Sequence, residues 1–368
     1  MNRGTPQKVY RYRRIGKYSV CLDQSIFDAL RTLGFGHTKY RLDSLGISSS
    51  RALRAFIIVA RNKFGGADPD NCLYLPVFGH VAMRVHRGHK VFDFRRSEVT
   101  KVFDRDVPMQ DAEVEIAACK TASAVSAAPQ YIASDPNTAW FSEEYIRGTH
   151  ATEIVSPRSS DYLSLYPDVE KCLIELLRCQ APIPVDASVH IDRLAEQSYR
   201  DRWLESGAQL EDVERITAYL GGLRTWLMEN ADSVPLQLIL THGDFSLVNA
   251  ISAEGGLRFI DWEGIGMGSL FSDLFNFMFT EHYYGRTSSR FTTEVDSTYR
   301  EFRDAILSGC PELTDAVSLP PVFTRRLYYL ERLRLLLDRD VSTNLLGVVR
   351  KSIAMFADFD SDVGNSPV

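Results

Sequence analysis

The spacing of apolar residues predicts short strands in the first part of the chain. Four runs between residues 72 and 104 have strand-like patterns: "CLYLPVF", "HVAMRVHR", "HKVFDFRR" and "EVTKVFD". Because short polar or turn segments separate them, an antiparallel sheet is the simplest interpretation. A helix over 109–123, begun by Asp111, and one further strand, "AWFSEEYI", are predicted before the break at Gly148.

Beyond Gly148 the apolar period changes to 3.6 residues, which predicts helices. The clearest are "YPDVEKCLIELLRC", "LEDVERITAYLGGLRTWLMEN" and "FTRRLYYLERLRLLLDRD". Two short strands, "QLIL" and "LRFID", interrupt these helices on either side of a Gly255-Gly256 turn. A sheet followed by a mainly helical region places the chain in the α+β class.

The opening region of the chain is basic. Residues 1–63 carry 13 lysines and arginines against three acids, a net charge of +10, whereas the whole chain carries −6. Within it, "SRALRAFIIVARNKF" predicts a helix whose apolar face consists of Leu53, Phe56, Ile57, Ala60 and Phe64. We favour packing of this face on the rest of the protein, with peripheral contact to an anionic membrane surface as the alternative. No recognised nucleic-acid-binding motif accompanies the charge, so we expect no nucleic acid partner.

Composition limits the class of protein. An apolar content of 45% and a charged content of 24% are typical of a globular chain. No run approaches the roughly 18 apolar residues that a membrane-spanning helix needs, and the basic start lacks the apolar core of a signal peptide. We therefore expect a cytoplasmic protein, peripheral to the inner face of the membrane if the basic region binds lipid. The six cysteines form no Cys-x-x-Cys pair, which predicts reduced thiols and no zinc site.

The segment "THGDFSLVNAISAEGGLRFIDWEG", residues 241–264, carries the chemistry. A hairpin between the two predicted strands would bring Asp244, Asn249 and Asp261 together. Two carboxylates and an amide form an oxygen-rich ligand set that suits Mg²⁺ beside substrate phosphates. In phosphoryl transfer, one acid orients the attacking hydroxyl while the other acid and the asparagine hold the metal. Phe245 and Trp262 would supply apolar walls that fix the two acids.

These two motifs resemble those of a known superfamily. "HGDFSLVN" followed by "FIDWEG" is similar to the signatures of the aminoglycoside phosphotransferase and choline kinase superfamily, the small-molecule branch of the protein-kinase-like fold. The resemblance implies that Asp244 is the catalytic aspartate, that Asn249 and Asp261 are magnesium ligands, and that His242 braces the catalytic loop. Asp273, in "LFSDLFNF", resembles a downstream structural aspartate. It also implies a two-lobed fold with a small antiparallel-sheet lobe and a mainly helical lobe.

The upstream half contains candidates for nucleotide binding. Lys101 lies on a predicted strand, where the resemblance implies a lysine that contacts the α- and β-phosphates. Glu115, on the next predicted helix, is its expected ion-pair partner, and Glu113 remains open because the helix phase is not fixed. "WFSEEYIRG" resembles the hinge, which assigns adenine contacts to Glu144 and Tyr145. The phosphate-covering loop departs from the pattern, because "VHRGHKV" offers little glycine.

The resemblance, with the breaker cluster "GGADPDN", predicts three regions. Residues 1–75 form a basic extension, residues 76–147 a nucleotide-binding lobe with the hinge, and residues 148–368 a helical lobe with the catalytic loop and acceptor site. Acceptor specificity is expected from the helices of the last region. Acids and aromatics there would suit a choline-like or aminoglycoside cation, and the same mixture suits a sugar, so none is assigned a binding role. They are Glu196, Asp201, Glu281, Tyr199, Trp203, Tyr283 and Tyr284.

Together these features predict a small-molecule kinase. The implied activity is Mg²⁺-dependent transfer of the γ-phosphate of ATP to a hydroxyl of a small molecule, such as a sugar or a cell-surface glycan precursor. The alternative of another class is a pseudokinase or binding module with the same fold. The enzyme is favoured because the expected lysine, both aspartates and the asparagine are all present. A protein kinase is disfavoured by the lack of "DFG" and "APE" segments. The oligomeric state and the choice between ATP and GTP remain open.

Overall fold

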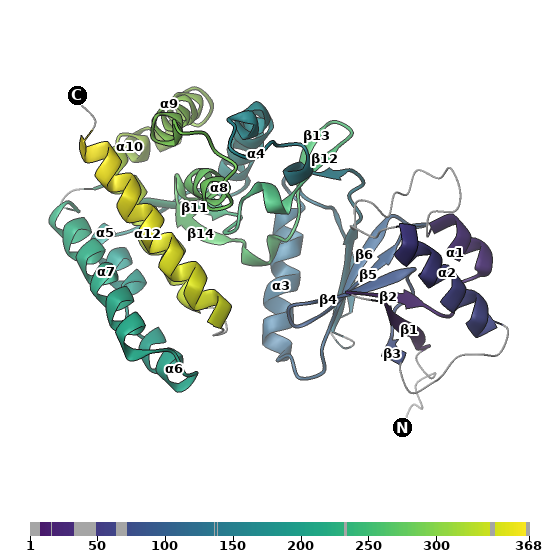
Figure 1. Cartoon of the computed structure of the whole chain (residues 1–368). Helices are drawn as coiled ribbons and strands as arrows, with labels where there is room; N and C mark the ends of the chain where they lie inside the picture. The colour runs from purple at the N-terminus through teal and green to yellow at the C-terminus, as the bar shows by residue number, and fades with distance from the viewer. Residues whose placement is uncertain are drawn as a thin grey trace. The chain divides into compact units, whose positions relative to one another are not determined.

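The computed structural model describes residues 8–15, 17–32, 49–63, 72–135, 137, 139–231, 234–338 and 343–365. The chain forms two compact units (Figure 1). The first contains the chain up to Ala151 together with Ala250–Glu263, and the second contains Thr152–Asn249 together with the chain from Gly264 onward. The catalytic-loop motif is therefore divided, with Asp244 and Asn249 in the second unit and Asp261 in the first.

The first unit is built on an eight-stranded antiparallel sheet. Its strand order is β3-β1-β2-β4-β5-β6-β8-β7. The strands are β1 (Tyr10–Ile15), β2 (Tyr18–Cys21), β3 (Cys72–Leu75), β4 (Val81–Val85), β5 (Gly88–Asp93), β6 (Glu98–Phe103), β7 (Tyr131–Asp135) and β8 (Trp140–Glu144). Five of them, β3, β4, β5, β6 and β8, correspond to predicted runs.

In the described part of this unit, the helices are α1 (Ile26–Thr32), α2 (Ser49–Lys63) and α3 (Met109–Ala122). Helix α2 contacts β1 and β2, whereas α3 contacts β7 and β8. Ala55 and Val59 of α2 are buried against Val99 of β6, and Ile116 of α3 is buried against Phe103 of β6. Because side chains alternate along a strand, Val99, Lys101 and Phe103 share one face, so Lys101 lies on the face that both helices cover.

The sequence prediction placed the first 75 residues in an extension outside the nucleotide-binding lobe. In the structure β1, β2 and β3 are strands of the same sheet. The predicted packing of α2 is present, but its buried face is shifted, because Leu53 and Ile57 are exposed while Ala55 and Val59 are buried. Small side chains allow a helix to approach a sheet closely, which the pattern of large apolar residues did not reveal. Phe64 lies outside the described residues.

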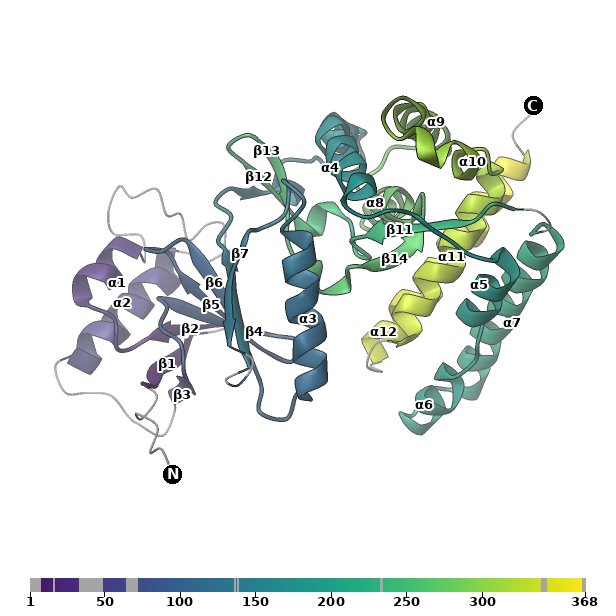
Figure 2. The same ribbon diagram turned by 180° about the vertical axis from the view of Figure 1, so that it is seen from behind.

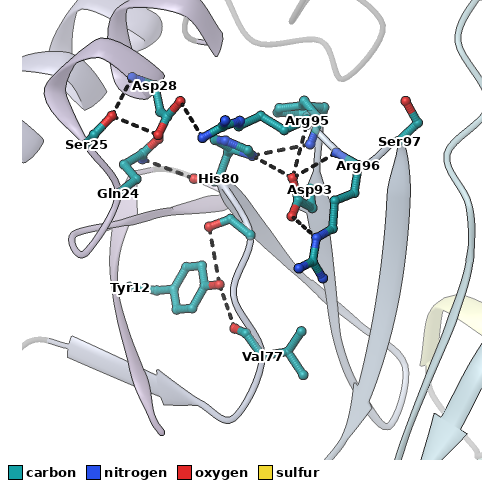
Figure 3. Close-up of polar contacts among 12 residues, drawn as sticks. Tyr12, Gln24, Ser25, Asp28, Val77, His80, Asp93, Arg95, Arg96 and Ser97 are labelled. Atoms are coloured by element: carbon teal, nitrogen blue, oxygen red, sulfur yellow. Dashed lines mark hydrogen bonds and ion pairs between the residues drawn. The ribbon is translucent and has the colours of Figure 1, made fainter.

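A buried polar network ties the N-terminal strands to the rest of the sheet (Figure 3). The Tyr12 hydroxyl donates to the carbonyl of Val77 at 2.9 Å, and the Gln24 amide donates to the carbonyl of His80 at 3.3 Å. The ring of His80 in turn accepts the N–H of Phe94 at 3.2 Å. Buried polar groups are costly unless they are bonded, so these contacts fix the position of β1 and of the segment before α1.

The second unit is mainly helical. Its helices are α4 (Tyr166–Cys179), α5 (Ala187–Leu194), α6 (Tyr199–Glu205), α7 (Leu210–Glu229), α8 (Ser272–Tyr283), α9 (Phe291–Gly309), α10 (Thr314–Val317), α11 (Pro321–Asp338) and α12 (Thr343–Asn365). Figure 2 shows α7, α11 and α12 side by side. Aromatic residues of α8, α11 and α12 stack at its centre, with Phe279 against Tyr328 and Phe356. Within the described residues, no helix is both long and apolar enough to cross a membrane.

Two small sheets position the motif of residues 241–264. Strand β11 (Gln237–Thr241) lies between β10 (Ile183–Pro184) and β14 (Gly266–Ser269) in the second unit. In the first unit, β12 (Ala250–Ala253) lies between β13 (Gly256–Phe259) and β9 (Thr149–His150). The predicted pairing of "QLIL" with "LRFID" is therefore wrong, since a turn at Glu254 and Gly255 joins β12 to β13. The weakly apolar "AISA" gave too little signal to be predicted as a strand.

The fold class is as the sequence predicted. The chain is α+β, with an antiparallel sheet unit followed by a mainly helical unit, as expected for the protein-kinase-like fold.

Candidate active site

The predicted catalytic loop begins where β11 ends. Gly243 has a φ of +80°, and an added Cβ would lie less than 3.0 Å from the carbonyl oxygen of Gly264, so a glycine is required on both counts. The buried carboxylate of Asp273 accepts the backbone N–H of His242 at 2.6 Å and that of Gly243 at 3.1 Å. Asp273 therefore has the structural role that the resemblance implied, holding the turn that leads into Asp244.

Asp244 is held on several sides. The amide nitrogen of Asn249 donates to its backbone carbonyl at 3.0 Å, and its own N–H donates to Nδ1 of His242 at 3.3 Å. Its carboxylate pairs with Arg332 of α11 at 3.1 Å. The sequence analysis did not identify Arg332, because a lone arginine in a helix 88 residues away carries no motif.

Phe245 supplies apolar support behind the loop, as the sequence analysis expects. The ring of Phe245 is fully buried and meets the ring of His242 edge-on at 5.7 Å. Asn276 of α8 donates to the carbonyl of Phe245 at 2.9 Å, and Glu281 accepts the N–H of Leu247 at 3.2 Å. Two side chains of α8 thus anchor the backbone of the loop.

In the first unit, Lys101 is buried on β6 with 2% of its side chain exposed. Its ammonium pairs with Glu115 of α3, and with Glu263 at 3.0 Å. Glu113, the open alternative, is exposed. Burial raises the pKa of Glu115, and the nearby lysine opposes that shift. The ion pair between strand lysine and helix glutamate has the arrangement that kinase-like nucleotide sites use to hold phosphates.

Asp261 is held by a lysine that the sequence analysis missed. Lys90 of β5 lies directly opposite Lys101 of β6 in the antiparallel register, and its ammonium pairs with the carboxylate of Asp261. Burial by itself would lower the pKa of Lys90, but the neighbouring carboxylates, Asp261 above all, raise it. Asp261 has a φ of +63°, a conformation that non-glycine residues seldom adopt and that concentrates at functional sites. Trp262 fixes the turn, because its Nε1–H donates to the carbonyl of Phe259 at 2.6 Å.

Lys90 and Lys101 belong to a larger charged group, here called the lysine cluster. Its members are Lys90, Lys101, Glu115, Glu143, Asp261 and Glu263. Four carboxyl groups face two ammonium groups, although burial raises the pKa of Glu143. Carboxylate oxygens are the hard donors that Mg²⁺ prefers, although no group of three or more acids, histidines or cysteines among the described residues is arranged to hold a metal ion. In the second unit, the amide nitrogen of Asn249 is committed to Asp244, so its amide oxygen is the atom of this side chain that a metal would use.

The predicted hinge lies at the end of β8. The backbone N–H of Glu144 donates to Gln130 and that of Tyr145 donates to Ser97, while the Glu144 carboxylate pairs with Arg258 at 2.8 Å. The Tyr145 ring packs edge-on against Phe94. Both N–H groups are used within the first unit, so adenine contacts at Glu144 and Tyr145 stay a prediction that would rely on other backbone atoms of this segment.

The loop between β4 and β5 is a two-residue turn, His86 and Arg87. An added Cβ at Gly88 would lie less than 3.0 Å from the carbonyl oxygen of Val102 on β6. Gly88 is therefore required by close packing of two strands, and the short turn differs from a glycine-rich phosphate loop.

Three of the candidate acceptor residues are structural. Tyr199 and Trp203 are buried, and Trp203 donates to the carbonyl of Leu337 at 3.2 Å. Glu281 is fully buried and pairs with Arg286. These contacts explain the residues through packing, so they give no support to a cation-binding role.

Comparison with protein families identifies the chain. Residues 92–306, more than half of its length, match the model of the Phosphotransferase enzyme family. The chain belongs to this family. Lys101, Asp244, Asn249 and Asp261 all lie within the matched residues, whereas Lys90 precedes them and Arg332 follows them.

Solved structures resemble this phosphotransferase family member at low identity. A choline/ethanolamine kinase family protein from Mesorhizobium loti is 15% identical, with 78% of this chain and 88% of that chain covered and a TM-score of 0.46. A thermostable mutant of an aminoglycoside phosphotransferase is 13% identical, with 78% and 91% covered and a TM-score of 0.48. A choline kinase from Streptococcus pneumoniae is 12% identical, with 74% and 90% covered and a TM-score of 0.46. No curated protein matches the chain.

Proposed function

We propose that this protein transfers the γ-phosphate of ATP, with Mg²⁺, to a hydroxyl group of a small molecule. The observation that carries the proposal is the buried ion pair between Lys101 and Glu115 in a member of a phosphotransferase family. Burial of a charged lysine costs free energy unless the charge has a partner. In kinase-like sites that charge is paired with a glutamate and binds the phosphates of the nucleotide.

Each unit would supply a different part of the reaction. Lys101 would bind the α- and β-phosphates, and Asp261 and Asn249 would hold Mg²⁺, whose charge offsets the negative charge of the transferred phosphate. Asp244 would accept a hydrogen bond from the acceptor hydroxyl and take its proton. Arg332, bonded to Asp244 at 3.1 Å, would keep that carboxylate in one orientation. His242 would brace the loop from its buried position.

The acceptor that the second unit favours is a neutral hydroxylated molecule such as a sugar. A cavity of about 250 Å³ in this unit is lined by Asp273, Glu331 and Asp338 together with three arginines. Asp273 is bonded to the loop backbone, Glu331 to Ser269, and Asp338 to Arg334 at 2.6 Å. Carboxylates that are already paired offer little to a choline-like or aminoglycoside cation. Hydroxyl groups, in contrast, can bond to such a lining as donors and as acceptors.

The pseudokinase alternative retains the same fold without turnover. The experiment that separates the two is an ADP-release assay on the full chain with Mg²⁺ and ATP, across neutral sugars, choline and aminoglycosides. We expect turnover with a sugar and at least a roughly hundredfold loss in Asp244→Ala, with ATP binding retained. Binding of ATP without turnover on any acceptor favours the pseudokinase, and turnover by Asp244→Ala at the parent rate contradicts the role of this aspartate.

Contact of the basic region with an anionic membrane surface remains a prediction, as does a cytoplasmic location. On α2, exposed Leu53 and Ile57 accompany exposed Arg54 and Arg61, a mixture that binds anionic lipid in amphipathic helices. Sedimentation with anionic vesicles at low salt and release at high salt would support the contact. Failure to sediment at low salt would leave packing on the sheet as the full role of α2.

A further inference from the structure

We propose that Lys90 occupies Asp261 when no nucleotide is bound and exchanges this carboxylate for a nucleotide phosphate when Mg²⁺ and nucleotide bind. The inference rests on the proposed function. It assigns to Lys90 a role in phosphate binding and in controlling access of the metal to Asp261. Lys90 lies outside the residues that match the family, which begin at residue 92.

Lys90 lies directly opposite Lys101 in the register of β5 and β6, so the two side chains leave the same face of the sheet. Its side chain is 15% exposed, whereas that of Asp261 is 46% exposed. The carboxylate is thus open to solvent while the lysine that binds it is enclosed. Two like charges on paired strands repel, and an anion placed between them would relieve that repulsion.

An ammonium group and Mg²⁺ both bind carboxylate oxygen, so Lys90 and the metal compete for Asp261. When the metal holds that carboxylate, the Lys90 ammonium loses its partner. A lysine ammonium is a point charge on a flexible four-carbon stem, which lets it move to another anion nearby. The nucleotide phosphates that Lys101 is proposed to bind are that anion.

Lys90 has a second acidic neighbour. Glu143 of β8 lines the same enclosed site as Lys90 and Asp261. Cys119 of α3 lies 3.5 Å from the Glu143 carboxylate. Lys90 therefore retains a carboxylate neighbour after it leaves Asp261. A purely structural pair would instead hold Lys90 on Asp261 whether or not nucleotide is present.

The exchange predicts opposite effects on two affinities. In Lys90→Met, Asp261 is released from competition, so the affinity for Mn²⁺ alone, a paramagnetic substitute for Mg²⁺, should rise roughly tenfold. The affinity for ADP at saturating Mg²⁺ should fall roughly tenfold, because one charged hydrogen bond to phosphate is lost. The matched control is Lys101→Met, which removes the opposite lysine. It should lower ADP affinity without raising Mn²⁺ affinity, because Lys101 pairs with Glu115 and Glu263.

Calorimetry for ADP and electron paramagnetic resonance for Mn²⁺, on the full chain, provide both numbers. A rise in Mn²⁺ affinity together with a fall in ADP affinity in Lys90→Met supports the exchange. If Lys90→Met folds and either its Mn²⁺ affinity or its ADP affinity is unchanged, the exchange is overturned. The proposed function is not affected by that result as long as the parent protein binds nucleotide. If neither ligand binds the parent protein, the proposed function fails first.

If Lys90→Met does not fold, a second variant tests the exchange. Removing Lys90 leaves Glu143 enclosed without its cation, a change that can destabilise the first unit. The double variant Lys90→Met/Glu143→Gln also removes the carboxylate charge of residue 143. Its affinities for ADP and for Mn²⁺ are measured in the same two titrations. The same pair of opposite shifts supports the exchange, and their absence overturns it.

Discussion

Replacement of Gly243 by alanine tests the geometry of the loop that carries Asp244. Two costs add at this position. An L-residue at a φ of +80° is strained by about 1–2 kcal/mol. The added Cβ would also lie less than 3.0 Å from the carbonyl oxygen of Gly264, and such overpacking costs about 1–3 kcal/mol. The free energy of unfolding of the second unit should therefore fall by about 2–5 kcal/mol.

Gly207 provides a matched control for this variant. It has a φ of +90°, and an added Cβ there meets no atom within 4 Å, so Gly207→Ala contains the backbone strain without the clash. Urea denaturation followed by tryptophan fluorescence should show a larger loss for Gly243→Ala than for Gly207→Ala, and ADP release should fall in Gly243→Ala alone. Equal stability losses in the two variants would refute the close approach of Gly243 to Gly264.

Three further predictions concern the same unit. Asp273→Ala leaves the N–H groups of His242 and Gly243 without their acceptor, so denaturation should show a loss of about 1–3 kcal/mol for each; a loss no larger than that of an exposed substitution would contradict this role. Arg332→Ala should lower kcat roughly tenfold with little change in the KM for ATP, measured beside Arg215→Ala, which changes an exposed arginine of the same unit, and equal effects of the two variants would count against a specific role. Burial raises the pKa of Asp273 from 3.8 to about 7, so between about pH 4 and pH 7 the folded protein binds a proton that the unfolded chain has lost. The free energy of unfolding should fall as pH rises through that window, and Asp273→Asn should lack this dependence in denaturation measured at several pH values.

The sequence predicted the parts of the fold that have a clear apolar period. Helices α4, α7 and α11 and strands β4 to β6 have patterns strong enough to identify without tertiary information. Strands β1 and β2 were missed, because "YRYRRI" and "YSVC" have charged or polar residues where a half-buried strand usually shows apolar ones. Their place in the sheet depends on pairing across the chain, with β1 next to β3 some sixty residues later. Such pairing is not visible in a local window.

Some residues of the candidate site could also be predicted from the sequence, and others could not. Lys101, Asp244, Asn249 and Asp261 were found because they stand in motifs with fixed spacing. Glu115 was preferred over Glu113, and the helix phase in the structure places Glu115 on Lys101. Arg332 and Lys90 were missed because each acts through a partner that is distant in sequence. Lys90 carried one weak signal: it lies in a strand beside Lys101, and two lysines that share a face of an enclosed sheet suggest an anion.

This protein is proposed to bind ATP with Mg²⁺, with Lys101 on the α- and β-phosphates. Calorimetric titration of the full chain with ATP and Mg²⁺ tests this binding in the parent protein, in Lys101→Met and in Lys120→Met, which changes an exposed lysine of the same unit. We expect the parent and Lys120→Met to bind alike and Lys101→Met to bind at least roughly tenfold more weakly. No binding by the parent protein, or equal binding by all three, would contradict the account.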